Sequence, residues 1–179
     1  MEKVKLHDKE FEMFISAEQI DAGIAEVAQA LDLALEGKRP LLLGVLNGSF
    51  LFMADLIKKM EIEMEISFVK LASYHGTSSS GSVKQIVGLN ERLKDRYVVI
   101  VEDIVDTGLT IKSLMASVME HQPAEVRVAT LLYKPDAYLE EIPIDHIALS
   151  VPNDFLVGYG LDYDGIGRNL NHIYKLVEE

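Results

Sequence analysis

Two almost purely apolar segments, each about as long as a β-strand, constrain the fold of this chain most. Leu41–Leu46 follows Pro40, and residues 97–101 are rich in β-branched side chains. Continuous apolar strands are typical of parallel sheets, because helices cover both faces of such sheets. Further segments of strand length occupy residues 66–72, 126–132, 146–151, 155–159 and 173–177.

Helical patterns alternate with these segments. Ser16 and Gln19 form a capping-box pattern, and apolar residues recur at helical spacing from there to residue 35. Residues 50–60 and 109–121 predict two more helices. The alternation predicts an α/β, doubly wound fold with a mainly parallel sheet flanked by helices. Because the 179 residues contain no repeat or linker, we expect a single domain over residues 1–179.

Composition excludes several classes of protein. The chain has no cysteine, which excludes disulfides, thiolate metal sites and a cysteine nucleophile. Its net charge of −12 argues against a nucleic-acid partner, which would require a basic face. The apolar segments are too short to cross a membrane, and no signal-type run opens the chain. We therefore expect a cytoplasmic protein without membrane partners.

Residues 101–110, with the sequence VEDIVDTGLT, carry the clearest chemical signal. Glu102 and Asp103 are adjacent carboxylates at the predicted end of a buried strand, where α/β sheets bind ligands. Such a pair suits a hydrated Mg²⁺ or the hydroxyls of a sugar. The following DTGLT turn leads into a helix, so its amides and hydroxyls can hold a phosphate.

Each of these residues alone fits a helix cap or a solvated side chain, and only the whole string favours a phosphate site. A receiver-type signalling domain also ends a strand in paired acids. However, it requires an early acidic pair on the first strand, which is followed here by Asn47, Gly48 and Ser49.

The string resembles the phosphoribosyl pyrophosphate motif of type I phosphoribosyltransferases, and its surroundings resemble the hypoxanthine-guanine branch of that family. The similarity extends to residues 45–50 as the pyrophosphate loop, Ser73-Tyr74 as the head of a catalytic lid, residues 132–134 and 155–163 as base-binding segments, and residues 168–170 as the end of the site. The resemblance implies a hood built from the chain ends. It also implies a cis peptide between Leu46 and Asn47 and a mobile lid over residues 73–85.

The resemblance implies transfer of the 5-phosphoribosyl group from phosphoribosyl pyrophosphate to hypoxanthine, and to guanine, giving IMP or GMP and pyrophosphate. Asp106 is then the general base or acid at purine N7. Lys134 donates to the 6-oxo group, Phe155 stacks on the base, and Leu156 contributes backbone groups. Asp162 belongs to the same base-binding segment.

The resemblance also assigns the phosphoribosyl pyrophosphate contacts and the metal. The expected contacts are Glu102, Asp103, Thr107, Gly108, Leu109 and Thr110, together with Leu46, Asn47, Gly48, Ser73, Tyr74 and Arg168. Mg²⁺ is the expected cofactor, with Glu102, Asp103 and Asp162 as its protein contacts. Some family members carry lysine in place of Asn47, so this loop has one cation fewer.

Two other functions remain open at this point. A sibling enzyme that prefers xanthine or guanine has the same motifs, because Lys134 and Phe155 do not separate these bases. A non-catalytic regulator with this fold that binds RNA is disfavoured by the net charge. The family resemblance further suggests a homodimer or homotetramer.

Overall fold

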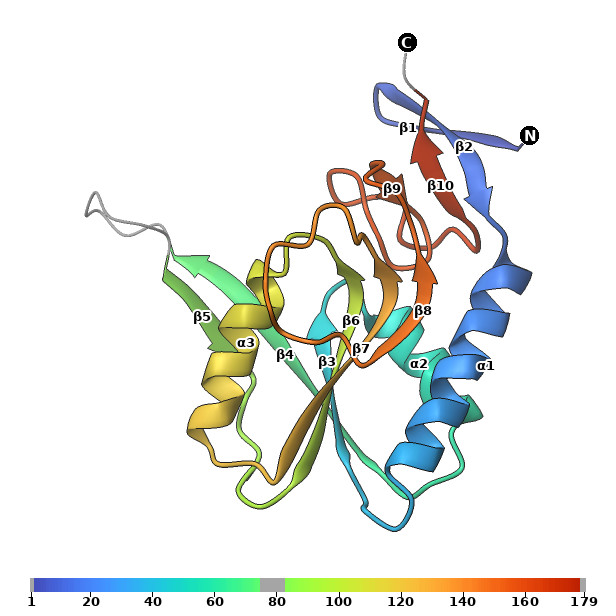
Figure 1. Cartoon of the computed structure of the whole chain (residues 1–179). Coiled ribbons are helices and arrows are strands. Elements are labelled where there is room, and N and C mark those ends of the chain that lie inside the picture. Colours follow the sequence, from blue (N-terminus) through green and yellow to red (C-terminus); the bar gives the residue numbers. More distant parts are fainter. Residues whose placement is uncertain (1, 75–82, 178–179) are drawn as a thin grey trace.

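The computed structural model describes residues 2–74 and 83–177 and contains a six-stranded sheet of order β5-β4-β3-β6-β7-β8 (Figure 1). All neighbouring strands pair in parallel except β5, which is antiparallel to β4 at one edge. The strands are β3 (Leu41–Leu46), β4 (Glu65–Tyr74), β5 (Val83–Val87), β6 (Tyr97–Val105), β7 (Glu125–Tyr133) and β8 (His146–Ser150). The predicted parallel sheet is confirmed.

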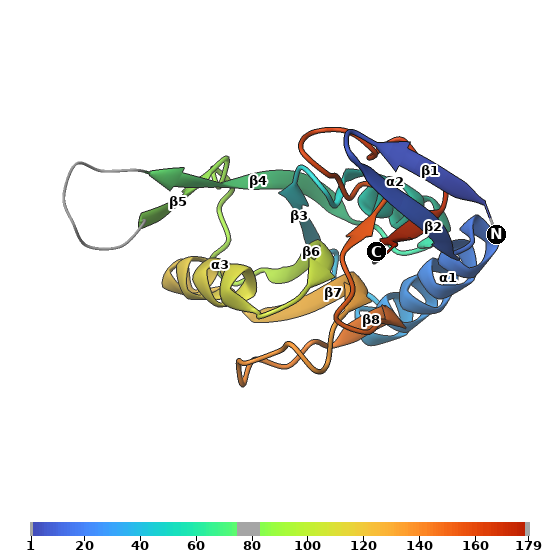
Figure 2. The same ribbon diagram turned by 90° about the horizontal axis from the view of Figure 1, so that it is seen from above.

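Helices cover both faces of this sheet. The helices α1 (Ala17–Ala34) and α2 (Phe50–Lys59) pack against each other and against one face, whereas α3 (Leu109–Glu120) covers the other (Figures 1 and 2). The predicted capping box at the start of α1 is present, because Ser16 and Gln19 each bond the backbone N–H of the other. Both faces of the central strands are therefore buried, as their continuous apolar sequence predicts.

A second, antiparallel sheet forms a hood from the two ends of the chain. Its order is β1-β2-β10-β9, with β1 (Lys3–Leu6), β2 (Lys9–Ile15), β9 (Leu156–Val157) and β10 (Ile173–Leu176). Phe11, Val157 and Tyr174 form its buried centre. The hood lies above the carboxyl ends of β6, β7 and β8 (Figure 1), so it encloses the edge where ligands bind in such sheets.

The predicted end of β6 was wrong by several residues. The strand continues to Val105 because it stays paired with β7 as far as Tyr133. Glu102 and Asp103 therefore lie within the last part of the strand. In the predicted lid, Ser73 and Tyr74 end β4 and pair with the start of β5, while residues 75–82 lie outside the described residues.

Within residues 2–74 and 83–177, no helix has the length and apolar character needed to span a membrane.

Candidate active site

A cavity of about 280 Å³ lies at the carboxyl end of β6 and is lined by residues 102–111. Gly108 has φ +87° and immediately precedes α3, whose first residue is Leu109. The backbone amides of this turn therefore lie at the positive end of the helix, where anions are stabilised. All six phosphoribosyl pyrophosphate contacts predicted in the string from Glu102 to Thr110 line this cavity, although the Leu109 side chain is exposed.

The two adjacent carboxylates differ in burial. Glu102 is buried, and its Oε1 accepts a hydrogen bond from the Asp103 amide at 3.3 Å. Asp103 is half-buried, and its Oδ1 accepts from the Ile104 amide at 2.9 Å. Burial raises the pKa of Asp103 above its ordinary value and outweighs the hydrogen bonds that lower it. A bound cation at this point would favour the ionised carboxylate again.

The predicted pyrophosphate loop packs directly on Asp103. The peptide between Leu46 and Asn47 is cis, as the resemblance implied. A β-carbon at Gly48 would lie 1.5 Å from Asp103 Oδ2, so only glycine fits there. The buried Ser49 hydroxyl donates to the Val45 carbonyl at 2.7 Å and anchors the loop to the end of β3.

The segment after β9 returns to the same loop. A β-carbon at Gly160 would lie 2.2 Å from the Gly48 carbonyl oxygen. The Gly160 carbonyl accepts from Arg168 Nη1 at 2.6 Å, and Arg168 Nη2 lies 2.6 Å from Asp162 Oδ1. Arg168 and Asp162 are therefore linked through Gly160 to the predicted pyrophosphate loop at Gly48.

The predicted base-binding side chains lie at the ends of β7 and β9. Lys134 is only 7% exposed, and its Nζ lies 3.2 Å from Asp106 Oδ2. Phe155 is 48% exposed and packs edge-on against Tyr163, with ring centroids 5.9 Å apart. Leu156 is buried in β9, where it pairs with Lys175 of β10.

Sequence reasoning missed the contribution of Tyr138. A β-carbon at Gly108 would lie 2.5 Å from the Tyr138 ring, and the Leu139 amide donates to the Thr107 carbonyl at 3.2 Å. The Tyr138 hydroxyl in turn donates to the Ile142 carbonyl at 2.5 Å. The segment after β7 therefore supports the turn at Thr107 and Gly108 from outside, and no local sequence pattern indicates this.

Asn47 is exposed beside Gly48. Ser73 and Tyr74 are the last two residues of β4, and only their backbone is described.

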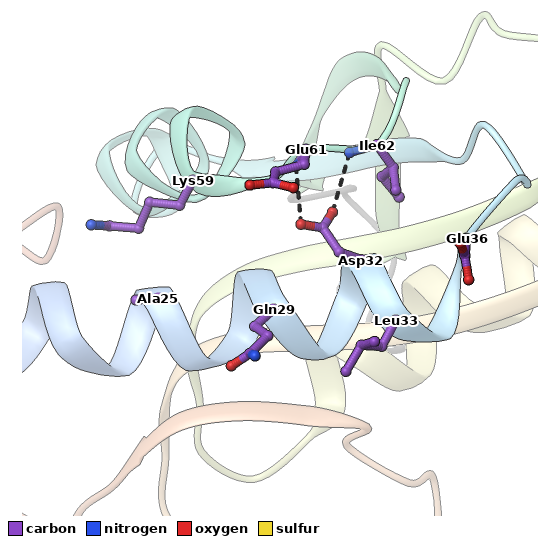
Figure 3. A pocket seen from close by; sticks show the side chains of 8 residues that line it. All are labelled: Ala25, Gln29, Asp32, Leu33, Glu36, Lys59, Glu61 and Ile62. Atoms are coloured by element: carbon purple, nitrogen blue, oxygen red, sulfur yellow. Dashed lines mark hydrogen bonds between the residues drawn. The ribbon is translucent and has the colours of Figure 1, made fainter.

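A second hollow, of about 550 Å³, lies between α1 and the segment after α2 (Figure 3). Asp32 accepts hydrogen bonds there from the amides of Glu61 and Ile62, at 3.0 and 3.3 Å. The hollow flanks the amino ends of β3 and β4, opposite the predicted site. Its polar groups tie α1 to that segment, and none of the predicted site residues lines it.

The site and fold together define a class of protein. A model of the phosphoribosyl transferase domain matches residues 16–164, and the chain belongs to this family.

Individual relatives narrow the similarity further. The hypoxanthine-guanine phosphoribosyltransferase of Lactococcus lactis is 43% identical over 174 residues, covering 96% of this chain and 94% of that protein. The Streptococcus pneumoniae protein of the same name is 40% identical over 168 residues, with 93% of each chain covered. A crystal structure of a hypoxanthine phosphoribosyltransferase from Staphylococcus aureus is 34% identical, with a TM-score of 0.85, 93% of this chain and 91% of that chain covered. The predicted resemblance is confirmed.

Proposed function

We propose that this chain transfers the 5-phosphoribosyl group from phosphoribosyl pyrophosphate to hypoxanthine and guanine, as an enzyme of purine salvage. The ion pair between the buried Lys134 and the partly exposed Asp106, which lines the cavity at the end of β6, is the observation that carries this proposal. One member is a hydrogen-bond donor and the other an acceptor, with 3.2 Å between them.

This pair matches one edge of a 6-oxopurine. Lys134 Nζ donates to the 6-oxo group, and an Asp106 carboxylate oxygen accepts the proton from N7. In adenine a 6-amino group would meet the ammonium group of Lys134, leaving two donors face to face in a buried position. Such unpaired polar groups discriminate strongly between ligands.

The reaction breaks the bond between ribose C1 and a pyrophosphate oxygen and forms a bond from C1 to purine N9. The N7 proton passes to Asp106, acting as general base. As in other glycosyl transfers, the sugar passes through an oxocarbenium-like state. The backbone amides of the loop at Gly48 and the guanidinium of Arg168 stabilise the leaving pyrophosphate. Leu46, Asn47, Ser73 and Tyr74 complete this part of the proposed site.

Mg²⁺ is the proposed cofactor, and its chemistry is to neutralise charge on the pyrophosphate. Glu102 and Asp103 would hold it through the ribose or through water, with Asp162 as a further contact. Within the described residues, no group of three or more carboxylate or histidine side chains is placed to bind a metal alone. That arrangement fits Mg²⁺, which is usually held by one or two carboxylates together with substrate phosphates and water.

The test is product formation from phosphoribosyl pyrophosphate and each of hypoxanthine, guanine, xanthine and adenine, with and without Mg²⁺. We expect metal-dependent formation of IMP and GMP. Asp106→Ala should lower kcat by about 10²–10⁴-fold, the contribution of a general base. Asp136→Ala is the matched control, because Asp136 is an exposed aspartate two residues after Lys134. If none of these bases yields a nucleotide, the proposal is refuted.

The same panel addresses the two alternatives. Preference for xanthine would indicate the sibling enzyme, whereas binding of nucleotides without turnover would indicate a regulator. Neither is favoured, because the relatives of 40–43% identity are named hypoxanthine-guanine phosphoribosyltransferases.

We also propose a cytoplasmic homodimer or homotetramer. Support comes from three exposed apolar side chains, Phe50 in α2 and Ile66 and Phe68 in β4, which are 37–43% exposed. Phe68 and Met53 of α2 both lie against Gly44, so Phe68 is on the same face of the sheet as α2. Sedimentation of the wild-type chain and of Phe68→Glu tests this, and an unchanged monomer in both contradicts it.

A further inference from the structure

Helix α2 and the loop after β9 meet at a pair of polar side chains, the buried Tyr159 and the partly exposed Asp55. The Tyr159 hydroxyl donates to Asp55 Oδ2 at 2.5 Å, and Asp55 Oδ1 lies 2.5 Å from Lys58 Nζ. Tyr159 is only 9% exposed. Neither residue contacts the phosphate cavity, so the reaction itself does not explain this pair.

The backbone at Tyr159 has a conformation that side chains disfavour. Its φ of 47° lies in the left-handed region, between Gly158 at 97° and Gly160 at 99°. The Tyr159 amide donates to the Leu170 carbonyl at 2.8 Å. A non-glycine residue persists in this region only where its surroundings fix it, so the bond to Asp55 contributes to holding the loop.

These contacts form a closed ring. Gly48 leads through Ser49 into α2, which carries Asp55. Asp55 accepts from Tyr159, which is followed by Gly160, and Gly160 packs directly on Gly48. A displacement of Tyr159 is therefore transmitted to the pyrophosphate loop.

The same ring of contacts also holds the Arg168 guanidinium. The Gly160 carbonyl accepts from Arg168 Nη1 at 2.6 Å, and the Arg168 carbonyl accepts from the Gly160 amide at 2.9 Å. Gly160 is thus bonded to Arg168 in both directions, and together with Asp162 it fixes the position of the guanidinium.

We infer that Tyr159 and Asp55 are positioning residues for the pyrophosphate half of the substrate: their hydrogen bond keeps Gly48 and Arg168 at a fixed separation. This inference rests on the proposed function, because it assigns the pair to the same site. It predicts a selective effect on pyrophosphate and phosphoribosyl pyrophosphate, with no effect on the purine base.

The pair stays in one protonation state. Burial and the hydrogen bond to Asp55 raise the pKa of Tyr159 far above its ordinary value. Burial opposes ionisation of Asp55, but the hydrogen bonds from Lys58 and Tyr159 outweigh it and lower the pKa. A neutral donor therefore faces a charged acceptor throughout the neutral pH range, so the contact does not change with pH in that range.

The experiment compares Tyr159→Phe with Tyr174→Phe. Tyr174 is the matched control because it is also a buried tyrosine, in β10 of the hood, whose hydroxyl donates to Glu2 Oε1 at 2.8 Å. Affinity for pyrophosphate with Mg²⁺ is measured by calorimetry, and KM is measured for both substrates. We expect Tyr159→Phe to weaken pyrophosphate binding about tenfold, equivalent to about 1.4 kcal/mol, and the control to leave it unchanged.

Variants of Asp55 provide a rescue that a purely structural role would not show. Asp55→Asn keeps an oxygen acceptor for Tyr159, so it should bind pyrophosphate more tightly than Asp55→Ala. Combining Asp55→Ala with Tyr159→Phe should add little to either single change, since both remove one interaction. Lys58→Ala should have no effect on pyrophosphate affinity.

The possible failures are distinguishable. If the wild-type protein binds neither pyrophosphate nor phosphoribosyl pyrophosphate, the proposed function and this inference both fall. If the wild type binds them and Tyr159→Phe binds equally well, only the inference is overturned. Equal losses of pyrophosphate affinity in Tyr159→Phe and Tyr174→Phe would mean that the pair has only a general stabilising role. An equal rise in KM for the purine base would mean the same. Either result overturns the inference.

Discussion

Replacing Gly48 with alanine introduces a single methyl group at the point where the pyrophosphate loop meets Asp103. The new β-carbon would lie 1.5 Å from Asp103 Oδ2 and 2.4 Å from its Cγ. The φ angle of Gly48 is not in the left-handed region, so the substitution adds steric overlap without backbone strain. Its effect therefore measures how closely the loop and the carboxylate must approach.

The size of the steric overlap determines how much stability and catalytic rate we expect the variant to lose. Real β-carbons essentially never approach other heavy atoms within 3.0 Å, so at least half of that distance must be made up by movement. Gly48 is confined by Gly160 and by the Ser49 anchor, so we expect Asp103 to move and to lose its bond from the Ile104 amide. Overpacking of this kind costs about 1–3 kcal/mol of stability. Misplacement of a reacting group by about 1 Å can cost about 100-fold in rate.

The assay is steady-state kinetics with phosphoribosyl pyrophosphate varied at saturating hypoxanthine, together with thermal unfolding. We expect kcat/KM for phosphoribosyl pyrophosphate to fall by about 100-fold. Gly37→Ala is the control, because Gly37 has φ +70° and no neighbour within 4 Å of its β-carbon position. It should lose some stability and no activity. A Gly48→Ala enzyme with wild-type kinetics would refute the argument that this contact sets the geometry of the site.

Three further predictions test the charged groups. Lys134→Met should lower kcat/KM for hypoxanthine by about 10–100-fold, the value of a hydrogen bond from a charged donor, and should reduce discrimination against adenine; competition kinetics measure both. Excess chelator should abolish turnover but leave the melting temperature unchanged, because no cluster among the described residues holds a metal by itself. Asp103→Asn should abolish activity yet raise the unfolding free energy at pH 8 and not at pH 3, as measured by denaturant titration. The raised pKa of folded Asp103 means that its ionisation costs stability as pH rises above the ordinary value of 3.8.

Much of the fold follows from the sequence because the signals are local. Apolar segments such as Leu41–Leu46 predict buried parallel strands, and Ser16 with Gln19 predicts the start of α1. The hood strands β1 and β2 gave no such signal, since charged and apolar residues are mixed along both and neither is a continuous apolar run. β1 pairs with β2, and β2 pairs with β10, more than 150 residues away, a contact that cannot be inferred from local pattern.

The candidate site likewise has one part that local sequence predicts and another part that it does not. Residues 102–110 are contiguous, so their shared role is visible in the sequence, and the structure places them around one cavity. The contacts of Gly48 with Asp103 and Gly160 join three distant segments, and each glycine alone looks like an ordinary turn residue. The bond between Asp55 and Tyr159 is equally invisible, because an aspartate in a helix and a tyrosine in a loop carry no distinguishing pattern.

The charges of the site explain how an acidic chain can hold an anionic substrate. The net charge is −12, and the two cations that we assign to the site are each paired with a carboxylate: Lys134 with Asp106 and Arg168 with Asp162. Positive side chains therefore do not outnumber negative ones around the cavity. Attraction of phosphate must come from the amides at the start of α3, the amides of the loop at Gly48, and the metal. Amides act only over short distances, so their positions have to be exact to a fraction of an ångström. That requirement explains why close glycine contacts surround the site, and why the hydrogen bond between Asp55 and Tyr159 helps to hold them in place.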